Sequence, residues 1–244
     1  MPRTALLPRS SEGDGALYRQ AERVAAVECV LFDLDGTLID TLELIRESMR
    51  YCTAAVLGAP LPDEVLMHNV GIPLRAQMRE FSEEHAEELL AAYRAHNNRV
   101  HDAMVREYPG VEEALAALSA KGLQLGIVTS KSGPVARRGL ERFGLQRFFE
   151  VVVSCDDVPV HKPEPYPLVY AAGLLGTPTE RCAYVGDSPH DMAAAVSAGC
   201  VSVAALWGVS DRERVLEPGP EYAVASMAEL ALLFGGREAE FRVD

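Results

Sequence analysis

The sequence predicts an α/β fold, in which helices flank a parallel β-sheet and an all-helical segment is inserted after the first strand. Short, nearly continuous apolar runs alternate with longer helical patterns, as in sheets that helices bury on both faces. The first two expected strands are separated by more than 90 residues, far more than one crossover helix needs. A glycine follows each helical pattern outside the insertion, where a left-handed residue ends a helix: Gly122, Gly144, Gly176 and Gly199.

The individual elements follow from the same patterns. A run of apolar β-forming residues, 29–32, leads directly into Asp33, Asp35 and Gly36, and predicts a buried strand that ends in a polar loop. Similar runs predict further strands at 125–129, 149–154, 182–186 and 200–204. Between these strands the periodicity predicts helices at 111–121, 134–143, 166–175 and 189–198.

The insertion spans about residues 41–104 and has a helical pattern throughout, with turns at 58–62 and 71–73. Ser82, followed by two glutamates, predicts the start of a long helix that ends near Ala103. Because the insertion leaves the carboxyl end of the first strand, it is expected to lie over the crevice where open α/β sheets bind ligands, as a lid. The predicted organisation is an N-terminal extension at 1–27, a core at 28–40 and 107–234, a helical cap at 41–106 and a C-terminal tail at 235–244.

Composition narrows the class of protein. With 244 residues, 48% of them hydrophobic and 24% charged, the chain is an ordinary globular protein. Its formal net charge of −13 argues against nucleic acid and anionic membranes as partners. No apolar run approaches the roughly 18 residues that a membrane span needs, and the N-terminus does not resemble a signal peptide. Five scattered cysteines indicate single thiols, so we expect a cytoplasmic protein. We also expect either a monomer or a weak homodimer.

Residues that can bind phosphate or a metal ion follow most of the predicted strands, and a parallel sheet brings such strand ends to one edge. They are Asp33 and Asp35 after the first strand, Thr129 and Ser130 after the second, Lys162 after the third, and Asp187 with Asp191 after the fourth. Carboxylates gathered at one edge repel one another and raise one another's pKa, unless a cation lies between them. Hard oxygen ligands suit Mg²⁺, and the metal together with Lys162 would make an anion site within an acidic protein.

These residues carry a family resemblance. The segment 33–37 (Asp-Leu-Asp-Gly-Thr) resembles the first motif of the haloacid dehalogenase superfamily, and 128–130, 162–165 and 186–188 with Asp191 resemble its other three motifs, in order. The similarity covers about residues 28–234. The insertion is similar to the cap of the phosphoglycolate phosphatase-like and β-phosphoglucomutase-like branch, and 71–74 resembles a Gly-x-Pro-Leu turn of the phosphatases. The resemblance implies a Rossmann-like core with an inserted helical cap.

The resemblance also implies a Mg²⁺-dependent phosphatase that acts on a small organic phosphate monoester. Asp33 would form an aspartyl-phosphate, and Asp35 would act as general acid and base. Phosphate binding falls to Gly36, Thr129, Ser130 and Lys162, with Arg75 of the cap as a candidate for the substrate's remote end. Mg²⁺ would be held by Asp33, Asp35, Asp187 and Asp191, Asp35 through its carbonyl and Asp191 directly or through an intermediary.

Several alternatives stay open. A hexose-phosphate mutase of the same fold would pass the phosphoryl group to a sugar, and an idle module would bind phosphate without turnover. A structural interpretation competes for some residues as well: Ser188 as a helix N-cap, Asp191 as an acid at a helix start, and Arg75 as a solvated side chain. The substrate itself, whether phosphoglycolate, a sugar phosphate or a biosynthetic intermediate, does not follow from the sequence.

Overall fold

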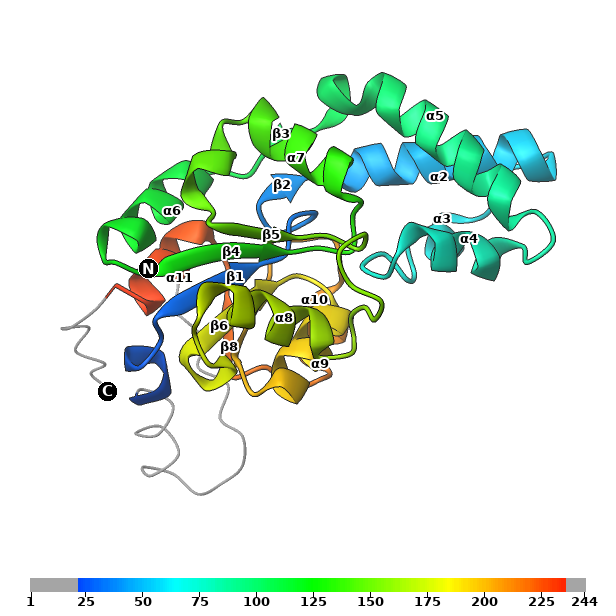
Figure 1. Ribbon diagram of the computed structural model, residues 1–244. Helices are drawn as coiled ribbons and strands as arrows, with labels where there is room; N and C mark the ends of the chain where they lie inside the picture. Colours follow the sequence, from blue (N-terminus) through cyan, green and yellow to red (C-terminus); the bar gives the residue numbers. More distant parts are fainter. Residues whose placement is uncertain (1–21, 236–244) are drawn as a thin grey trace.

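The computed structural model describes residues 22–235 of the chain. The predicted C-terminal tail, apart from residue 235, and the predicted N-terminal extension as far as residue 21 lie outside the described residues. Between them a six-stranded, entirely parallel sheet runs in the order β5-β4-β1-β6-β7-β8, with helices on both faces (Figure 1). The predicted α/β fold class is thus confirmed.

The strands are short and almost wholly apolar. They are β1 (Cys29–Phe32), β4 (Gln124–Val128), β5 (Val151–Val153), β6 (Cys182–Gly186), β7 (Val201–Ala205) and β8 (Tyr222–Val224). The first five match the predicted strands to within about two residues at each end. The sixth, β8, was not predicted, because three residues are too few to establish a pattern. β1 lies in the middle of the sheet, paired with β4 on one side and β6 on the other, so the loop after it is central.

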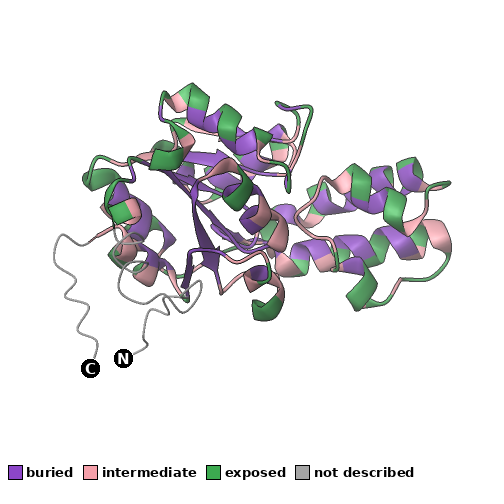
Figure 2. Ribbon diagram, turned by 90° about the horizontal axis from the view of Figure 1, so that it is seen from below, coloured by how far each residue is buried: buried purple, intermediate pink, exposed green. Residues whose placement is uncertain are grey.

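Alternation along β1 divides the core between the two faces of the sheet. Val30 and Phe32 belong to the cluster under α6 (Val111–Ala120), α7 (Gly133–Arg142) and α11 (Met227–Leu233). Cys29 and Leu31 belong to the cluster under α8 (Tyr166–Leu175) and α9 (Pro189–Ala198). The remaining elements of this part are the 3-10 turns η1 (Leu145–Phe148) and η2 (Thr179–Arg181) and the short α10 (Arg212–Leu216). Figure 2 shows the buried sheet between these two layers of helices.

The insertion forms a helical body beside the carboxyl edge of the sheet (Figures 1 and 2). It contains α2 (Leu42–Leu57), α3 (Asp63–Leu66), α4 (Leu74–Phe81) and α5 (Ala86–Met104). These helices share an apolar cluster of their own, with Met49, Leu66, Met78 and Leu89 at its centre. The chain enters and leaves through β2 (Ile39–Asp40) and β3 (Arg106–Glu107), which pair antiparallel and hold the two crossings together.

One predicted helix boundary is wrong. Ser82 does not start the long helix; it is the C-cap residue of α4, and its backbone N–H bonds to the carbonyl of Met78. Its hydroxyl accepts a hydrogen bond from the amide of His85, and α5 begins only at Ala86, with Glu87 and Glu88 in its first turn. The serine therefore does satisfy a backbone donor, but in the turn that precedes the helix. No helix between residues 22 and 235 has the length and apolar character that a membrane crossing requires.

Candidate active site

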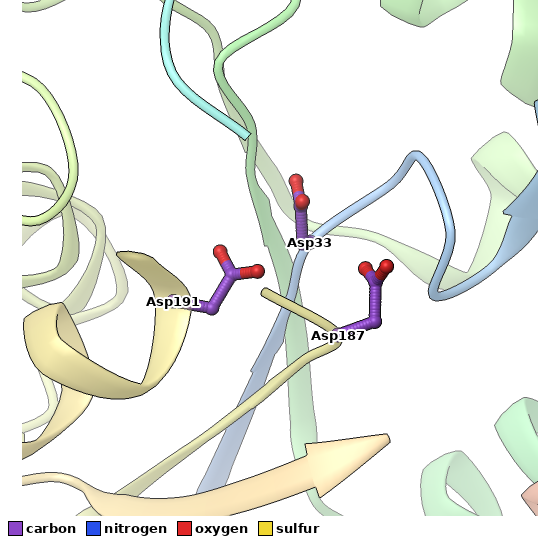
Figure 3. A group of neighbouring side chains, drawn as sticks. All are labelled: Asp33, Asp187 and Asp191. Carbon is purple, nitrogen blue, oxygen red and sulfur yellow. The ribbon is translucent and has the colours of Figure 1, made fainter. Parts of the chain in front are cut away.

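The structure brings the predicted site residues of the core to one place. Figure 3 shows the carboxylates of Asp33, after β1, Asp187, after β6, and Asp191, on the first turn of α9, around a common space. One oxygen of each carboxylate lies within 4.8 Å of those of the other two. All three residues are buried, with 4%, 3% and 0% of their surfaces exposed. Three acids this close in the interior need a positive charge among them.

A cavity of about 670 Å³ opens above this cluster, between the sheet edge and the helical insertion. On the core side its walls include Asp33, Asp35, Thr129, Lys131 and Asp187. The insertion contributes a wall of mixed polarity: Ile45, Met49, Gly71, Pro73, Arg75, Gln77, Tyr93, Arg94 and Asn97. The volume suits a small molecule enclosed by both parts of the chain.

Asp33 lies in a strongly perturbed environment. Burial raises the pKa of its carboxyl to about 7, although the ammonium of Lys162 opposes the rise. The Lys162 Nζ atom is 3.2 Å from Asp33 Oδ1, but that oxygen has no hydrogen-bond partner among the described residues. A buried carboxylate oxygen with no hydrogen bond, close to a cation, is available to an incoming electrophile or metal ion.

Two groups of the protein, Asp191 and Tyr184, hold the ammonium of Lys162 in place. Its Nζ atom donates to Asp191 Oδ1 at 2.6 Å and to the hydroxyl of Tyr184 at 2.9 Å. Burial lowers the pKa of this ammonium, but the carboxylates of Asp191 and Asp33 outweigh that effect and raise the pKa above its ordinary value. Lys162 is therefore a fixed positive charge beneath Asp33. Tyr184 was not predicted to take part, because a tyrosine in the apolar run of β6 resembles any other core residue.

Asp191 uses both of its oxygens within the protein. Oδ1 accepts from Lys162 and lies 3.1 Å from the Tyr184 hydroxyl, while Oδ2 accepts from the amide and the hydroxyl of Ser188 at 3.0 and 2.6 Å. Ser188 in turn accepts from the amide of Asp191, which completes a capping box at the start of α9. The N-cap interpretation of Ser188 is confirmed. The position of Asp191 is set by this cap and by Lys162.

Asp187 is fixed from the opposite side. Its Oδ1 accepts from the Thr37 hydroxyl at 2.9 Å and its Oδ2 from the amide of Val209 at 2.7 Å. Burial and the nearby charges of Asp191 and Asp33 raise the pKa of this carboxyl well above its usual value. Gly36 has a φ of +79°, and a Cβ atom there would lie 2.2 Å from Asp187 Oδ2. Only glycine permits the loop after β1 to pass so close to this carboxylate.

Asp35 does not join the three buried acids through its side chain. Both of its carboxylate oxygens accept from Lys131 Nζ, each at 2.7 Å, on the wall of the cavity. Thr129, 5% exposed, accepts from the amide of Lys131 at 3.2 Å. Ser130 donates its hydroxyl to the carbonyl of Gly71 at 2.6 Å and so connects the core to the insertion. The pairing of Lys131 with Asp35 has no signal in the local sequence, because the two residues are 96 positions apart.

Arg75 is not part of the cluster of Asp33, Asp187 and Asp191. It is on α4, where it lines the cavity and forms an ion pair with Glu87 of α5, and its side chain is 51% exposed. The structure thus places Arg75 on the cavity wall formed by the insertion and gives it a partner within the protein.

Comparisons with known proteins agree with this geometry. Residues 30–205 match the family model for haloacid dehalogenase-like hydrolases. The pyrophosphatase PpaX of Halalkalibacterium halodurans is 36% identical over 209 residues, which cover 86% of this chain and 97% of the relative. The crystal structure of a predicted phosphoglycolate phosphatase from Haemophilus somnus is similar at a TM-score of 0.76 with 26% identity, over 85% of this chain and 98% of that one.

A predicted phosphatase from Clostridium acetobutylicum is similar to the same degree, with a TM-score of 0.76 and 27% identity over 84% of this chain and 97% of that chain. The family match covers the strand ends that carry the site. The chain belongs to the haloacid dehalogenase-like hydrolase family.

Proposed function

We propose that this phosphatase of the haloacid dehalogenase-like family hydrolyses a small phosphate compound through an aspartyl-phosphate on Asp33. The observation that carries the proposal is the buried Asp33 carboxylate, which lies beside the fixed ammonium of Lys162 at the floor of the cavity and has an oxygen without a hydrogen bond. A carboxylate oxygen of Asp33 attacks phosphorus, and the bond from phosphorus to the leaving oxygen breaks. Water then attacks the aspartyl-phosphate, which releases phosphate and restores the carboxylate.

Asp35 supplies the proton chemistry in this proposal. It donates a proton to the leaving oxygen and later takes one from the attacking water, so the carboxyl returns to its starting state. Its position on the same loop, two residues after Asp33, places it beside the phosphoryl group but outside the buried acid cluster.

The phosphoryl oxygens would be bound by Lys162, the hydroxyl of Thr129 and the backbone amides of Gly36 and Ser130. The hydroxyl of Ser130 is already used, because it donates to the carbonyl of Gly71. We therefore assign binding at Ser130 to its amide. Lys162 counters the charge that Asp33 and the phosphoryl group bring together in a buried site.

The residues present fit a Mg²⁺ ion. The raised pKa values of Asp33 and Asp187 indicate a crowding of negative charge that a divalent cation would relieve. The carboxylates of Asp33 and Asp187 and the carbonyl of Asp35 would hold the ion. Asp191 would support them through its neighbours, since each of its oxygens has two hydrogen-bond partners, whereas each oxygen of Asp187 has one. Such an ion supplies positive charge where negative charge develops on the phosphoryl group.

We propose further that the segment 41–106 is a cap domain that closes over the site, with hinges at 38–42 and 105–110. Hydrogen bonds join it to the core at several points: Ser130 donates to the carbonyl of Gly71, Arg214 to that of His68 at 2.8 Å, and Arg138 to that of Asn98 at 3.0 Å. The β2–β3 pair lies at the hinge segments. Closure would keep water from the aspartyl-phosphate until the leaving group has departed.

A small phosphate monoester remains the first substrate class, and inorganic pyrophosphate is a second candidate. The pyrophosphatase name of the relative from Halalkalibacterium halodurans, which is 36% identical, favours the second. Lys131, Arg75 and Arg94 line the cavity. An unsubstituted hydrocarbon leaving group would instead favour a wholly apolar wall. Both classes use the same chemistry at Asp33, so they differ only in what the cap side must bind.

The test uses para-nitrophenyl phosphate with Mg²⁺ and the isosteric variant Asp33→Asn. Turnover by the wild type and a loss of about a thousandfold or more in the variant are expected, because the amide is a poor nucleophile. Asp63→Asn, in an exposed pair with Arg50, is the matched control and should retain turnover. Full activity of Asp33→Asn would refute the proposal, and binding without turnover by the wild type would favour the idle module. Formation of glucose 6-phosphate from β-glucose 1-phosphate without phosphate release would identify the mutase instead.

A further inference from the structure

The ion pair between Lys131 and Asp35 conflicts with the role proposed for Asp35. Lys131 Nζ lies 2.7 Å from both carboxylate oxygens of Asp35, so both oxygens are engaged by the ammonium. Their side chains are only 13% and 19% exposed, so the pair is partly shielded from water. For Asp35 to reach a leaving oxygen, this ammonium must move away.

The surroundings of Lys131 allow such a movement by the side chain alone. Its backbone is held at both ends: the amide donates to Thr129 Oγ1 at 3.2 Å, and the carbonyl accepts from the amide of Cys155 at 3.1 Å. The four-carbon stem of a lysine has several rotatable bonds, so the ammonium can turn while the loop stays in place. Both Lys131 and Asp35 line the cavity, so a bound substrate reaches the pair.

The other cations of the site are less able to serve an incoming anion. Lys162 is 3% exposed and committed to Asp33, Asp191 and Tyr184. Arg75 forms its ion pair with Glu87. Arg94 lines the cavity from α5 and is, within residues 22–235, the competing candidate that the experiment must separate from Lys131.

We propose that Lys131 is a positioning residue that makes the enzyme selective for phosphates whose leaving group carries a second anionic group. Lys131 holds the Asp35 carboxylate in the absence of substrate and exchanges it for the anion of the leaving group. Asp35 is then free to take up a proton from solvent and to face the leaving oxygen, to which it donates that proton. A neutral leaving group offers the ammonium no replacement for a carboxylate, so it leaves Asp35 held. This inference rests on the proposed function and narrows its substrate class to such compounds, of which phosphoglycolate and pyrophosphate are examples.

The experiment compares two substrates of nearly equal size, phosphoglycolate and 2-hydroxyethyl phosphate, which differ in a carboxylate against a hydroxymethyl group. The measured quantity is the ratio of their kcat/KM values with Mg²⁺, which cancels effects common to both substrates. The variants are Lys131→Gln, which removes the charge, and Lys131→Arg, which keeps it. Lys121→Gln is the matched control, because Lys121 is an exposed lysine at the end of α6, and Arg94→Gln tests the competing cation.

In the wild type we expect a ratio well above one. Lys131→Gln should lower it by about tenfold to a hundredfold, the usual effect of losing one charge-assisted hydrogen bond. The variant should raise KM for phosphoglycolate, because its carboxylate loses the ammonium that binds it, and should raise kcat for 2-hydroxyethyl phosphate, because Asp35 is no longer held. Lys131→Arg should recover part of the ratio, and Lys121→Gln should leave it unchanged.

Three results would overturn the inference. One is a wild-type ratio at or below one; another is a ratio in Lys131→Gln within about threefold of the wild type; the third is a ratio that falls in Arg94→Gln but not in Lys131→Gln. In each case the Asp33 chemistry would stand, since it requires only turnover. If the wild type hydrolyses neither these esters nor para-nitrophenyl phosphate, it is the proposed function that fails, and this inference with it.

Discussion

The Tyr184→Phe substitution isolates a single hydroxyl group beneath the proposed nucleophile. That hydroxyl lies 2.8 Å from the carbonyl oxygen of Val128 and 2.9 Å from Lys162 Nζ, and Tyr184 is 0% exposed. Phenylalanine keeps the ring and the packing of the core. The change therefore removes the polar contacts of the hydroxyl and little else.

The expected cost follows from those contacts. Two contacts with charged groups are lost, namely the hydrogen bond from Lys162 and the 3.1 Å contact with Asp191 Oδ1. Among the side chains of residues 22–235, Lys162 Nζ is then the remaining donor to the carbonyl of Val128, at 3.4 Å. Against the gain from burying a less polar ring, we expect a loss of about 2 kcal/mol in the free energy of unfolding. This corresponds to a decrease in Tm of roughly 4 to 8 °C for a chain of this size. Because Lys162 is held less firmly, we also expect kcat to fall about tenfold.

Urea unfolding followed by circular dichroism measures the first effect, as a shift of the midpoint at constant m-value. Tyr222→Phe is the control, because Tyr222 is 3% exposed on the edge strand β8, away from the acid cluster. It should cost less than about 1 kcal/mol and leave kcat unchanged. If Tyr184→Phe costs no more than Tyr222→Phe and keeps full kcat, then the hydroxyl does not hold Lys162 in place.

Two further predictions concern the acid cluster. Gly36→Ala should destabilise the protein by more than the roughly 1 to 2 kcal/mol of left-handed backbone strain, because its Cβ would lie 2.2 Å from Asp187 Oδ2. Gly58→Ala is the control, because Gly58 has a φ of +86° but open space around it, so this variant should show the strain alone. Equal Tm values for the two variants would contradict the prediction. The pKa of Asp33 is raised to about 7 in the native state, whereas the unfolded chain releases this proton above about pH 4. Without metal, the free energy of unfolding should therefore fall as the pH rises from about 4 toward 8. Excess Mg²⁺ should therefore raise Tm more at pH 8 than at pH 6, measured against EDTA by thermal unfolding, and an equal rise at both would argue against a carboxylate site.

Much of the fold follows from local sequence patterns. The apolar runs before Asp33, Thr129 and Asp187 define strands, and the parallel topology alone then brings the following residues to one edge. That is why the sequence predicts that residues as distant as Asp33 and Lys162 lie close together. β8 escaped prediction because it is three residues long, and the start of α5 was misplaced because a serine followed by glutamates is compatible with a turn as well as with an N-cap.

The finer arrangement of the site depends on side-chain contacts that local patterns do not encode. Lys131 follows a predicted strand, and that position does not determine what its ammonium contacts. Its contact with Asp35 depends on how two loops meet. Tyr184 reads as an apolar strand residue, and only the approach of Lys162 from another loop gives its hydroxyl a role. The sequence indicates either a metal ligand or an acid at a helix start for Asp191. It does not indicate the four hydrogen bonds that Asp191 accepts from three separate residues.

The central claim is that the carboxylate of Asp33 carries the phosphoryl group during turnover. The most direct measurement is to stop the reaction with acid in the steady state and to locate the phosphoryl group by mass spectrometry of the peptides. We predict one phosphoryl group on the peptide that contains Asp33, present only when substrate and Mg²⁺ were both supplied. Phosphate release at the full rate with that peptide unmodified, or with the phosphoryl group on another side chain, would contradict the account.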